Sequence, residues 1–225
     1  MASSKKVGIV GSGLVGKSWA MIFASKGYQV KRNEFNLWHK LLVKWYQLRQ
    51  VVLFDINQEI VDKAVAHIGT QLKDLEAENS LRGDLTADQQ IALVSGTADL
   101  KEAVQGSCYL QECVPEDLDL KLKVWTSIDN LVTDKSMILA SSTSCIVPSK
   151  ISEGLKHRDQ FIVAHPVNPP YFVPMVELVP GMLRKPCQQA MPQEKCNTTY
   201  QSSNNAKLSY QRFRPHNENG LRKII

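Results

Sequence analysis

The sequence lacks the features of a membrane or secreted protein. No apolar run among its 225 residues comes near the ~18 residues that a membrane-spanning helix needs. The first residues have no apolar core of the kind found in signal peptides. None of the five cysteines forms a C-x-x-C pair or a zinc-ligand spacing. These absences argue against a spanning helix, a structural metal site and a disulfide framework, and they predict a cytoplasmic protein with reduced thiols.

Basic residues are not spread evenly along the chain, although the net charge is +5. Residues 182–225 hold eight Lys or Arg and two acidic residues, and residues 32–52 hold four Lys or Arg and one Glu. The remainder of the chain is therefore acidic on balance. Because the basic excess is confined to these two segments, we predict neither a nucleic-acid partner nor a membrane partner.

A glycine motif near the N-terminus is the most informative feature present. The apolar run 7–10 predicts a buried strand, and the motif Gly11-x-Gly13-x-x-Gly16 leads from it into a helix expected over 14–26. Gly11 allows a tight turn, Gly13 lets the backbone approach a diphosphate, and Gly16 lets the helix pack on the strand. The diphosphate would lie at the helix N-terminus. A plain glycine-rich turn is the alternative.

A dinucleotide site also needs an acid at the end of the second strand. Asp55, after the apolar run 50–54, lies 39 residues beyond Gly16, about 20 more than usual. Gln-Val at 29–30 recurs at 50–51, which indicates an insertion over 29–49 whose residues 33–49 can form an amphipathic helix. Asp55 there would hold the ribose and repel a 2′-phosphate, so NAD is preferred over NADP. Alternatively, Asp55 is only a turn residue.

The middle of the chain alternates helical and strand patterns, which predicts an α/β fold with a doubly wound, mainly parallel sheet. In the long helix expected over 56–78, one face would carry Ile60 and His67 together with Ala64, Ile68, Leu72 and Leu75. Residues 182–225 show neither a helical nor a strand periodicity and are expected to form a disordered tail. We expect further helices at 86–93, 101–104 and 118–132, and strands at 94–100, 108–114, 136–140 and 161–164.

Chemically capable side chains follow several of these strands. The run 141–144 of Ser and Thr follows one buried strand, and His165 follows another. Glu177 is a lone carboxylate in an apolar run, while Glu116 and Lys121 bracket the turn after residue 114. The carboxyl ends of parallel strands form the ligand-binding edge of such sheets. Several of these residues also have a purely structural interpretation. His165 would then be a core histidine, the 141–144 run a helix cap, and Glu177 a partly exposed strand residue.

These residues belong to longer stretches, 10–13 with 18–21, 111–118, 141–145, 164–171 and 176–180. Together the stretches resemble the 3-hydroxyacyl-CoA dehydrogenase family, and within it the members that oxidise the sugar acid L-gulonate. The resemblance covers residues 7–31 and 50–181. It implies a Rossmann-type NAD-binding domain over 5–181, interrupted by the 29–49 insertion.

The resemblance also implies an activity and a role for each site residue. The activity is hydride transfer from the 3-hydroxyl carbon of L-gulonate to NAD, giving 3-dehydro-L-gulonate, with His165 as general base and Glu177 as its orienting partner. An imidazole can take up a proton near neutral pH. The resemblance further implies that Leu14 and Val15 lie in the diphosphate turn and that Asp55 holds the ribose. Glu116 and Lys121 would approach the nicotinamide side, and Ser144 and Asn168 would make substrate or catalytic contacts. No metal is implied.

The chain departs from the family pattern in its C-terminal part. The resemblance implies a helical C-terminal domain that closes the substrate cleft and forms a homodimer, and residues 182–225 do not resemble it. We therefore expect this chain to be monomeric or prone to aggregate, with little activity of its own. Two other functions stay open: a structural, crystallin-like protein that binds NAD without turnover, and a dehydrogenase of 3-hydroxyacyl-CoA.

Overall fold

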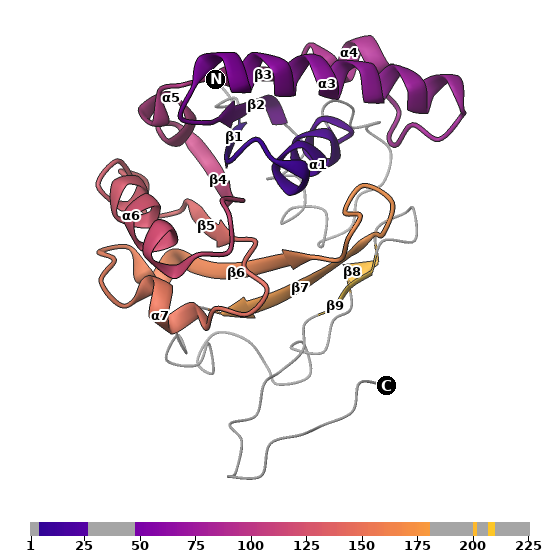
Figure 1. The fold of residues 1–225 in the computed structure, drawn as a ribbon. Helices are drawn as coiled ribbons and strands as arrows, with labels where there is room; N and C mark the ends of the chain where they lie inside the picture. The colour runs from indigo at the N-terminus through magenta and orange to yellow at the C-terminus, as the bar shows by residue number, and fades with distance from the viewer. Residues whose placement is uncertain (1–4, 27–47, 181–199, 202–206, 210–225) are drawn as a thin grey trace.

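A mainly parallel sheet forms the centre of the molecule. The computed structural model describes residues 5–26, 48–180, 200–201 and 207–209 (Figure 1). In this part of the chain the strand order is β3-β2-β1-β4-β5-β6-β7-β9-β8. The first six strands pair in parallel, and β7 runs antiparallel to β6. The strands are β1 (Lys5–Val10), β2 (Leu48–Phe54), β3 (Val94–Thr97), β4 (Ser107–Glu112), β5 (Ile138–Ser141), β6 (Phe161–Pro166), β7 (Met175–Pro180), β8 (Tyr200–Gln201) and β9 (Lys207–Ser209).

Helices cover both faces of this sheet. Since successive strand residues point to opposite sides, each face carries apolar side chains that a layer of helices buries. One hydrophobic core holds Ile9 and Leu53 under α1 and α3, and the other holds Val10 and Leu110 under α6 and α7. The predicted doubly wound α/β fold is thereby confirmed. The helices are α1 (Leu14–Ala24), α3 (Gln58–Ala77), α4 (Ala87–Ile91), α5 (Leu100–Val104), α6 (Leu118–Asp129) and α7 (Pro148–Ser152), with a 3-10 turn η1 (Arg158–Gln160).

The buried face of α3 differs from the prediction by one position. Ile60 is 46% exposed and His67 is also exposed, whereas Val61 is fully buried. The helix starts at its cap Asn57, whose side chain accepts a hydrogen bond from the Glu59 N–H at 2.8 Å. From that start the buried stripe is Val61, Ala64, Ile68, Leu72 and Leu75.

The second strand begins at Leu48, just before the predicted end of the 29–49 insertion. Strand β2 pairs with β1 in parallel, with Val51 opposite Val7 and Phe54 opposite Val10. The prediction that the run 50–54 belongs to the second strand is therefore confirmed, with Asp55 directly after the strand and the strand start at 48 rather than 50. Most of the insertion itself lies outside the described residues.

Within the predicted tail, the structure describes only β8 and β9, two short strands that the sequence pattern did not indicate. Strand β9 pairs in parallel with β7. The rest of 182–225 lies outside the described residues. No helix in the described ranges is long and apolar enough to cross a membrane.

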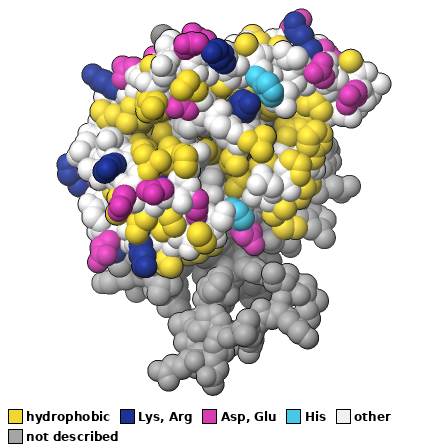
Figure 2. Space-filling view, viewed as in Figure 1, with side chains coloured by type: hydrophobic (Ala, Val, Ile, Leu, Met, Phe, Trp, Pro, Cys, Tyr) yellow, Lys and Arg dark blue, Asp and Glu magenta, His cyan; other side chains and the backbone are white. Residues whose placement is uncertain are grey.

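On the face drawn in Figure 2, patches of hydrophobic side chains alternate with acidic and basic ones. The large hydrophobic side chains that remain exposed are Leu14, Ile56, Ile60, Leu120, Val147, Phe172 and Met175.

Candidate active site

The glycine turn is built as the motif predicts, with a different reason for each glycine. Gly11 has a φ of 103°, which favours glycine, and its N–H donates to the Phe54 carbonyl at 2.9 Å. A Cβ at Gly16 would lie 1.9 Å from the Gly11 carbonyl oxygen. A Cβ at Gly13 would meet no atom within 4 Å. Open space therefore lies in front of the start of α1, where the first N–H groups of a helix lack intrahelical partners.

Asp55 lies at the end of β2 and is bonded to this turn. Its Oδ2 accepts hydrogen bonds from the Ser12 N–H at 2.8 Å and from the Ser12 hydroxyl at 2.6 Å. Leu14 and Ile56, 65% and 85% exposed, give the neighbouring surface an apolar character. Open space at a helix start, a strand-end carboxylate and exposed apolar side chains fit a dinucleotide.

His165 and Glu177 form a cross-strand pair at the other end of this edge. They lie opposite each other in the antiparallel pairing of β6 with β7. The His165 Nδ1 is 2.9 Å from Glu177 Oε2. The side chains are 28% and 60% exposed, respectively. Because Nδ1 is engaged by the carboxylate, Nε2 is the ring nitrogen left to face a ligand, which is the arrangement of a base with an orienting group.

The hairpin that carries this pair is attached to the loop before α4. The Arg82 N–H donates to the Tyr171 hydroxyl oxygen at 2.9 Å, and the Arg82 guanidinium lies 5.3 Å from the centre of the Tyr171 ring. Tyr171 itself is buried in the core beneath α1 and α3. The segment after His165 is thus held against the cofactor-side half of the sheet.

Glu116 organises the Ser and Thr turn after β5. Its Oε1 accepts hydrogen bonds from the Thr143 hydroxyl at 2.5 Å, the Ser144 N–H at 2.9 Å and the Cys145 N–H at 3.1 Å. Burial alone would raise the pKa of Glu116, but these hydrogen bonds and the charge of Lys121 lower the pKa to about 2. Glu116 is therefore an anion over the physiological pH range, and it fixes the backbone that presents Ser144.

Lys121 lies behind Glu116 and is only 1% exposed. Its Nζ is 2.7 Å from Glu112 Oε1 and 3.5 Å from Glu116 Oε2. The structure therefore brings Lys121 to the expected region but covers its ammonium with protein. Glu112 is fully buried, and our sequence reasoning missed it. The available signal was a charged residue inside an apolar strand, because a buried charge requires partners.

Gln111 joins the ends of three neighbouring strands. Its Nε2 donates to the Ser142 hydroxyl at 2.7 Å and to the Ala164 carbonyl at 3.3 Å. The residue before His165 is thereby tied to the Ser and Thr turn. Asn168 lies exposed two residues beyond β6. The structure thus places Ser144 and the His165–Glu177 pair on one edge, with Asn168 in the segment that follows.

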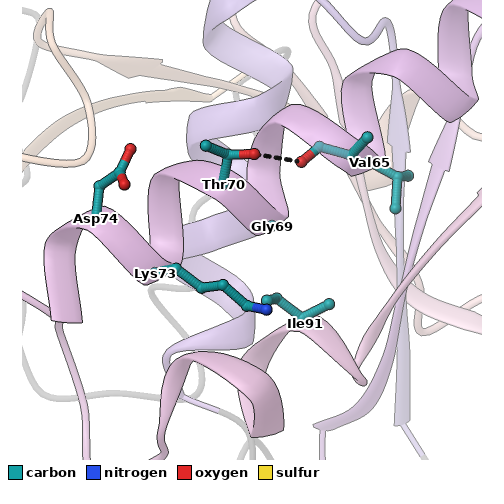
Figure 3. Close-up of a pocket in the computed structure, with 7 residues that line it drawn as sticks. Val65, Gly69, Thr70, Lys73, Asp74 and Ile91 are labelled. Carbon is teal, nitrogen blue, oxygen red and sulfur yellow. Dashed lines mark hydrogen bonds between the residues drawn. The ribbon is translucent and has the colours of Figure 1, made fainter. Parts of the chain in front are cut away.

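The pocket drawn in Figure 3 is a separate feature, lined by residues of α3 and by Ile91 of α4. Among its labelled residues, Thr70 donates its hydroxyl hydrogen to the backbone carbonyl of Ala66 at 3.3 Å. The lining contains none of the candidate site residues and consists of Val65, Ala66, Gly69, Thr70, Lys73, Asp74 and Ile91. In the described part of the chain, no group of three His, Cys, Asp or Glu residues could hold a metal ion.

Comparison with known proteins identifies relatives of this domain. The model of the family "3-hydroxyacyl-CoA dehydrogenase, NAD binding domain" matches residues 6–37 and 43–189. The chain is 48% identical over 172 residues to the Lambda-crystallin homolog of Mus musculus, covering 76% of this chain and 47% of that protein. It is 38% identical over 173 residues to an L-carnitine dehydrogenase/betainyl-CoA thioesterase of Ruegeria pomeroyi, covering 76% of this chain and 30% of that protein.

A solved structure supports the same assignment. The (S)-3-hydroxybutyryl-CoA dehydrogenase PaaH1 from Ralstonia eutropha is 28% identical with a TM-score of 0.64, covering 80% of this chain and 55% of that one. The chain spans about half the length of the curated lambda-crystallin relatives that it matches.

Proposed function

The chain belongs to the 3-hydroxyacyl-CoA dehydrogenase family and carries that family's NAD-binding domain, and from this premise we propose that it takes part in NAD-dependent oxidation of a 3-hydroxy acid. The proposed substrate is L-gulonate and the product 3-dehydro-L-gulonate. The observation that supports the proposal is the His165–Glu177 pair, in which Nδ1 lies 2.9 Å from Oε2. The pair lies on the sheet edge that also carries the glycine turn.

The cofactor half of the site would consist of the glycine turn and two carboxylates. The diphosphate would lie in the open space before α1, against the N–H groups of Leu14 and Val15. Asp55 would hold the adenosine ribose, and Glu116, with Lys121 behind it, would border the nicotinamide. When bound, NAD supplies the hydride acceptor.

The catalytic half would remove the hydroxyl proton. His165 would take that proton at Nε2, since Nδ1 is held by Glu177. The Glu177 carboxylate would stabilise the imidazolium that forms and keep the ring in one orientation. Ser144, on the turn held by Glu116, and Asn168, beyond β6, would bind the substrate's polar groups.

A 3-hydroxyacyl-CoA is the second candidate substrate, favoured by the match to the family model and by the similarity to PaaH1. We favour the sugar acid because the stretches that resemble L-gulonate-oxidising members include those that carry Glu116 and His165. A cytoplasmic location stays a prediction, and so does the expectation that this chain is monomeric or prone to aggregate, although the resemblance implies a homodimer for the family.

The test compares the unmodified protein with His165→Ala. NADH binding is measured by fluorescence, and NADH formation is followed with L-gulonate and with 3-hydroxybutyryl-CoA. Because the chain spans half the length of its relatives, both versions are also tested as fusions to the remaining half of the mouse Lambda-crystallin homolog. General-base loss should lower turnover by roughly 10²- to 10⁴-fold and leave NADH binding nearly unchanged.

His67→Ala is the matched control, since His67 is exposed on α3. It should leave turnover unchanged. Near-normal turnover in His165→Ala would make that histidine structural. NADH binding without turnover of either substrate, in both the chain and the fusion, would favour the structural, crystallin-like function. Absence of NADH binding would contradict the proposal altogether.

A further inference from the structure

Strands β5 and β6 separate just before the candidate catalytic histidine. Their parallel pairing ends at Ser141 and Val163. Beyond this pair, β5 stops and the chain turns into the Ser and Thr run, while β6 continues to Pro166. In the register described for these strands, no residue of β5 pairs with Ala164 or His165. Backbone pairing therefore holds the end of β6 from the β7 side only.

The side chain of Gln111 spans this gap from β4. Gln111 lies opposite Ala140 in the pairing of β4 with β5, and Ala140 lies opposite Ile162 in the pairing of β5 with β6. These three residues share one face of the sheet with Ala164, which lies two positions beyond Ile162. Because Ala140 has only a methyl group, the Gln111 amide can extend across β5, and its Nε2 lies 3.3 Å from the Ala164 carbonyl oxygen.

Both N–H groups and the carbonyl oxygen of the Gln111 amide have partners. One Nε2 hydrogen is donated to the Ala164 carbonyl, and the other to the Ser142 hydroxyl oxygen at 2.7 Å. The Oε1 atom accepts a hydrogen bond from the Tyr109 hydroxyl. An amide has only two N–H donors, so these partners select one orientation of the fully buried side chain. The amide therefore fixes how the Ser and Thr turn lies relative to the end of β6.

We infer that Gln111 is a positioning residue, which holds the base and the substrate-binding turn at a fixed separation without contacting substrate or cofactor. It bonds to Ala164, directly before His165, and to Ser142, two residues before Ser144. The inference rests on the proposed function, because the two groups that it relates are the base and the substrate contact proposed there. A displacement of about 1 Å between such groups can lower a rate by about a hundredfold.

The experiment compares the unmodified protein with Gln111→Leu, which removes both donors from a side chain of similar size. In the chain itself, histidine side chains are labelled with ¹⁵N, and the His165 signals are assigned by their loss in His165→Ala. We expect these signals to shift in Gln111→Leu, with NADH affinity nearly unchanged. In the fusion to the remaining half of the mouse Lambda-crystallin homolog, kcat with L-gulonate should fall by roughly ten- to a hundredfold, and the KM for NAD should stay the same.

Gln160→Leu is the matched control, because it removes another buried glutamine amide from the opposite end of β6. Gln160 directly precedes the strand, and its Nε2 donates to the Asp134 carbonyl at 3.3 Å. This variant should change neither kcat nor the His165 signals. Melting temperatures are measured for all variants, and activities are compared well below them.

Ser142→Ala keeps the test decisive if Gln111→Leu folds poorly, since Ser142 is only partly buried. It removes one of the two acceptors of the Gln111 amide and leaves the bond to Ala164 in place. We expect kcat to fall by a smaller factor than in Gln111→Leu, with NADH affinity again nearly unchanged.

The possible outcomes separate this inference from the proposed function. Unchanged kcat and unchanged His165 signals in Gln111→Leu would overturn the inference. An equal loss of kcat in Gln160→Leu, or a matching loss of NADH affinity in Gln111→Leu, would trace the effect to the stability of the whole domain and also overturn it. If the unmodified fusion oxidises neither candidate substrate, the proposed function fails, and the His165 signals of the chain still decide whether Gln111 holds the end of β6.

Discussion

At the scale of single residues, Asp55 bears most directly on which dinucleotide the site prefers. Its carboxylate is held at the end of β2 by the Ser12 N–H and hydroxyl. Like charges about 4 Å apart repel by about 1 kcal/mol in water and about 4 kcal/mol near a protein surface. We therefore expect tighter binding of NADH than of NADPH, and at least about a fivefold narrowing of that preference in Asp55→Ala. Parallel fluorescence titrations measure both affinities. Equal affinities in the unmodified protein would remove Asp55 from the ribose site.

The Glu116 carboxylate should make stability depend on acidic pH. Burial acts to raise its pKa, but hydrogen bonds from the 143–145 turn and the charge of Lys121 lower the pKa from 4.5 to about 2. A lowered pKa stabilises the folded state above the unfolded value, and this contribution is lost as the pH falls toward the folded value. The difference in unfolding free energy between the unmodified protein and Glu116→Gln should therefore shrink between about pH 5 and about pH 2.

Urea denaturation at a series of pH values measures this difference. Glu153→Gln, which removes an exposed carboxylate near α7, is the control for loss of a surface charge. A difference between the unmodified protein and Glu116→Gln that stays constant across the acid range would show that the hydrogen bonds to Glu116 do not stabilise its charged form.

Single residues differ in how far the sequence could place them. The sequence could predict that Asp55 and His165 lie at one edge, because each follows an apolar run and the strand ends of a parallel sheet meet at one edge. The direct pairing of His165 with Glu177 depends on the antiparallel register of β6 with β7, which no local pattern gives. Glu112 was missed because its partners, Lys121, Trp125 and Ser141, come from separate elements.

At the scale of elements, the β1–turn–α1 unit predicts that alanine substitutions at two of its glycines lower stability by different amounts. A Cβ at Gly16 would collide with the Gly11 carbonyl at 1.9 Å, so Gly16→Ala must shift α1 away from β1. A Cβ at Gly13 meets only open space, and Gly13 precedes the helix in an extended conformation. Gly13→Ala should cost about 1 kcal/mol of stability or less, as an exchange at an N-cap position, while weakening NADH binding. Gly16→Ala should lower stability more.

Thermal denaturation and NADH titration of the two variants distinguish these effects. Gly154→Ala is the control, because a Cβ there also meets no atom within 4 Å and the residue lies beyond α7. Unchanged NADH binding in a folded Gly13→Ala variant would mean that no ligand approaches this part of the turn.

Helix α3 shows why local periodicity predicts where a helix lies but not which of its residues are buried. The pattern in α3 correctly gave a long helix, and Ala64, Ile68, Leu72 and Leu75 are buried as predicted. The prediction that Ile60 and His67 lie on the buried face was wrong, because the sheet and α1 cover fewer positions of α3 than its pattern of apolar residues suggested. Tertiary packing, which selected Val61 instead, decided between two nearly equivalent faces.

At the scale of the whole molecule, sheet order brings distant segments together. Strand β1 lies between β2 and β4, so the glycine turn is next to both Asp55 and the β4–α6 turn that carries Glu116. Strands β5 and β6 then extend the sheet (Figure 1), and this edge continues to Ser144, after β5, and to His165, near the end of β6. The sequence predicted the alternation of strands and helices, but it could not give the order of strands across the sheet.

The same topology predicts that the 29–49 segment can be removed. Strand β2 pairs with β1 through the second Gln-Val copy, with Val51 opposite Val7. Deleting 29–49 joins Tyr28 to Gln50 and leaves a connection of ordinary length between α1 and β2. Each halving of loop length returns ~0.6 kcal/mol of closure entropy, so stability should stay the same or rise by about 1 to 2 kcal/mol. NADH binding should be retained.

A deletion of equal length over 35–55 is the matched control, because it keeps the first Gln-Val copy and removes the strand that the structure pairs with β1. That variant loses Val52, Leu53 and the Asp55 carboxylate, so it should lose both cooperative unfolding and NADH binding. Circular dichroism melting curves and NADH titration measure both properties. If the 35–55 deletion folds and binds NADH as well as the 29–49 deletion, the first copy can serve as the second strand, and the placement of the insertion before β2 is wrong.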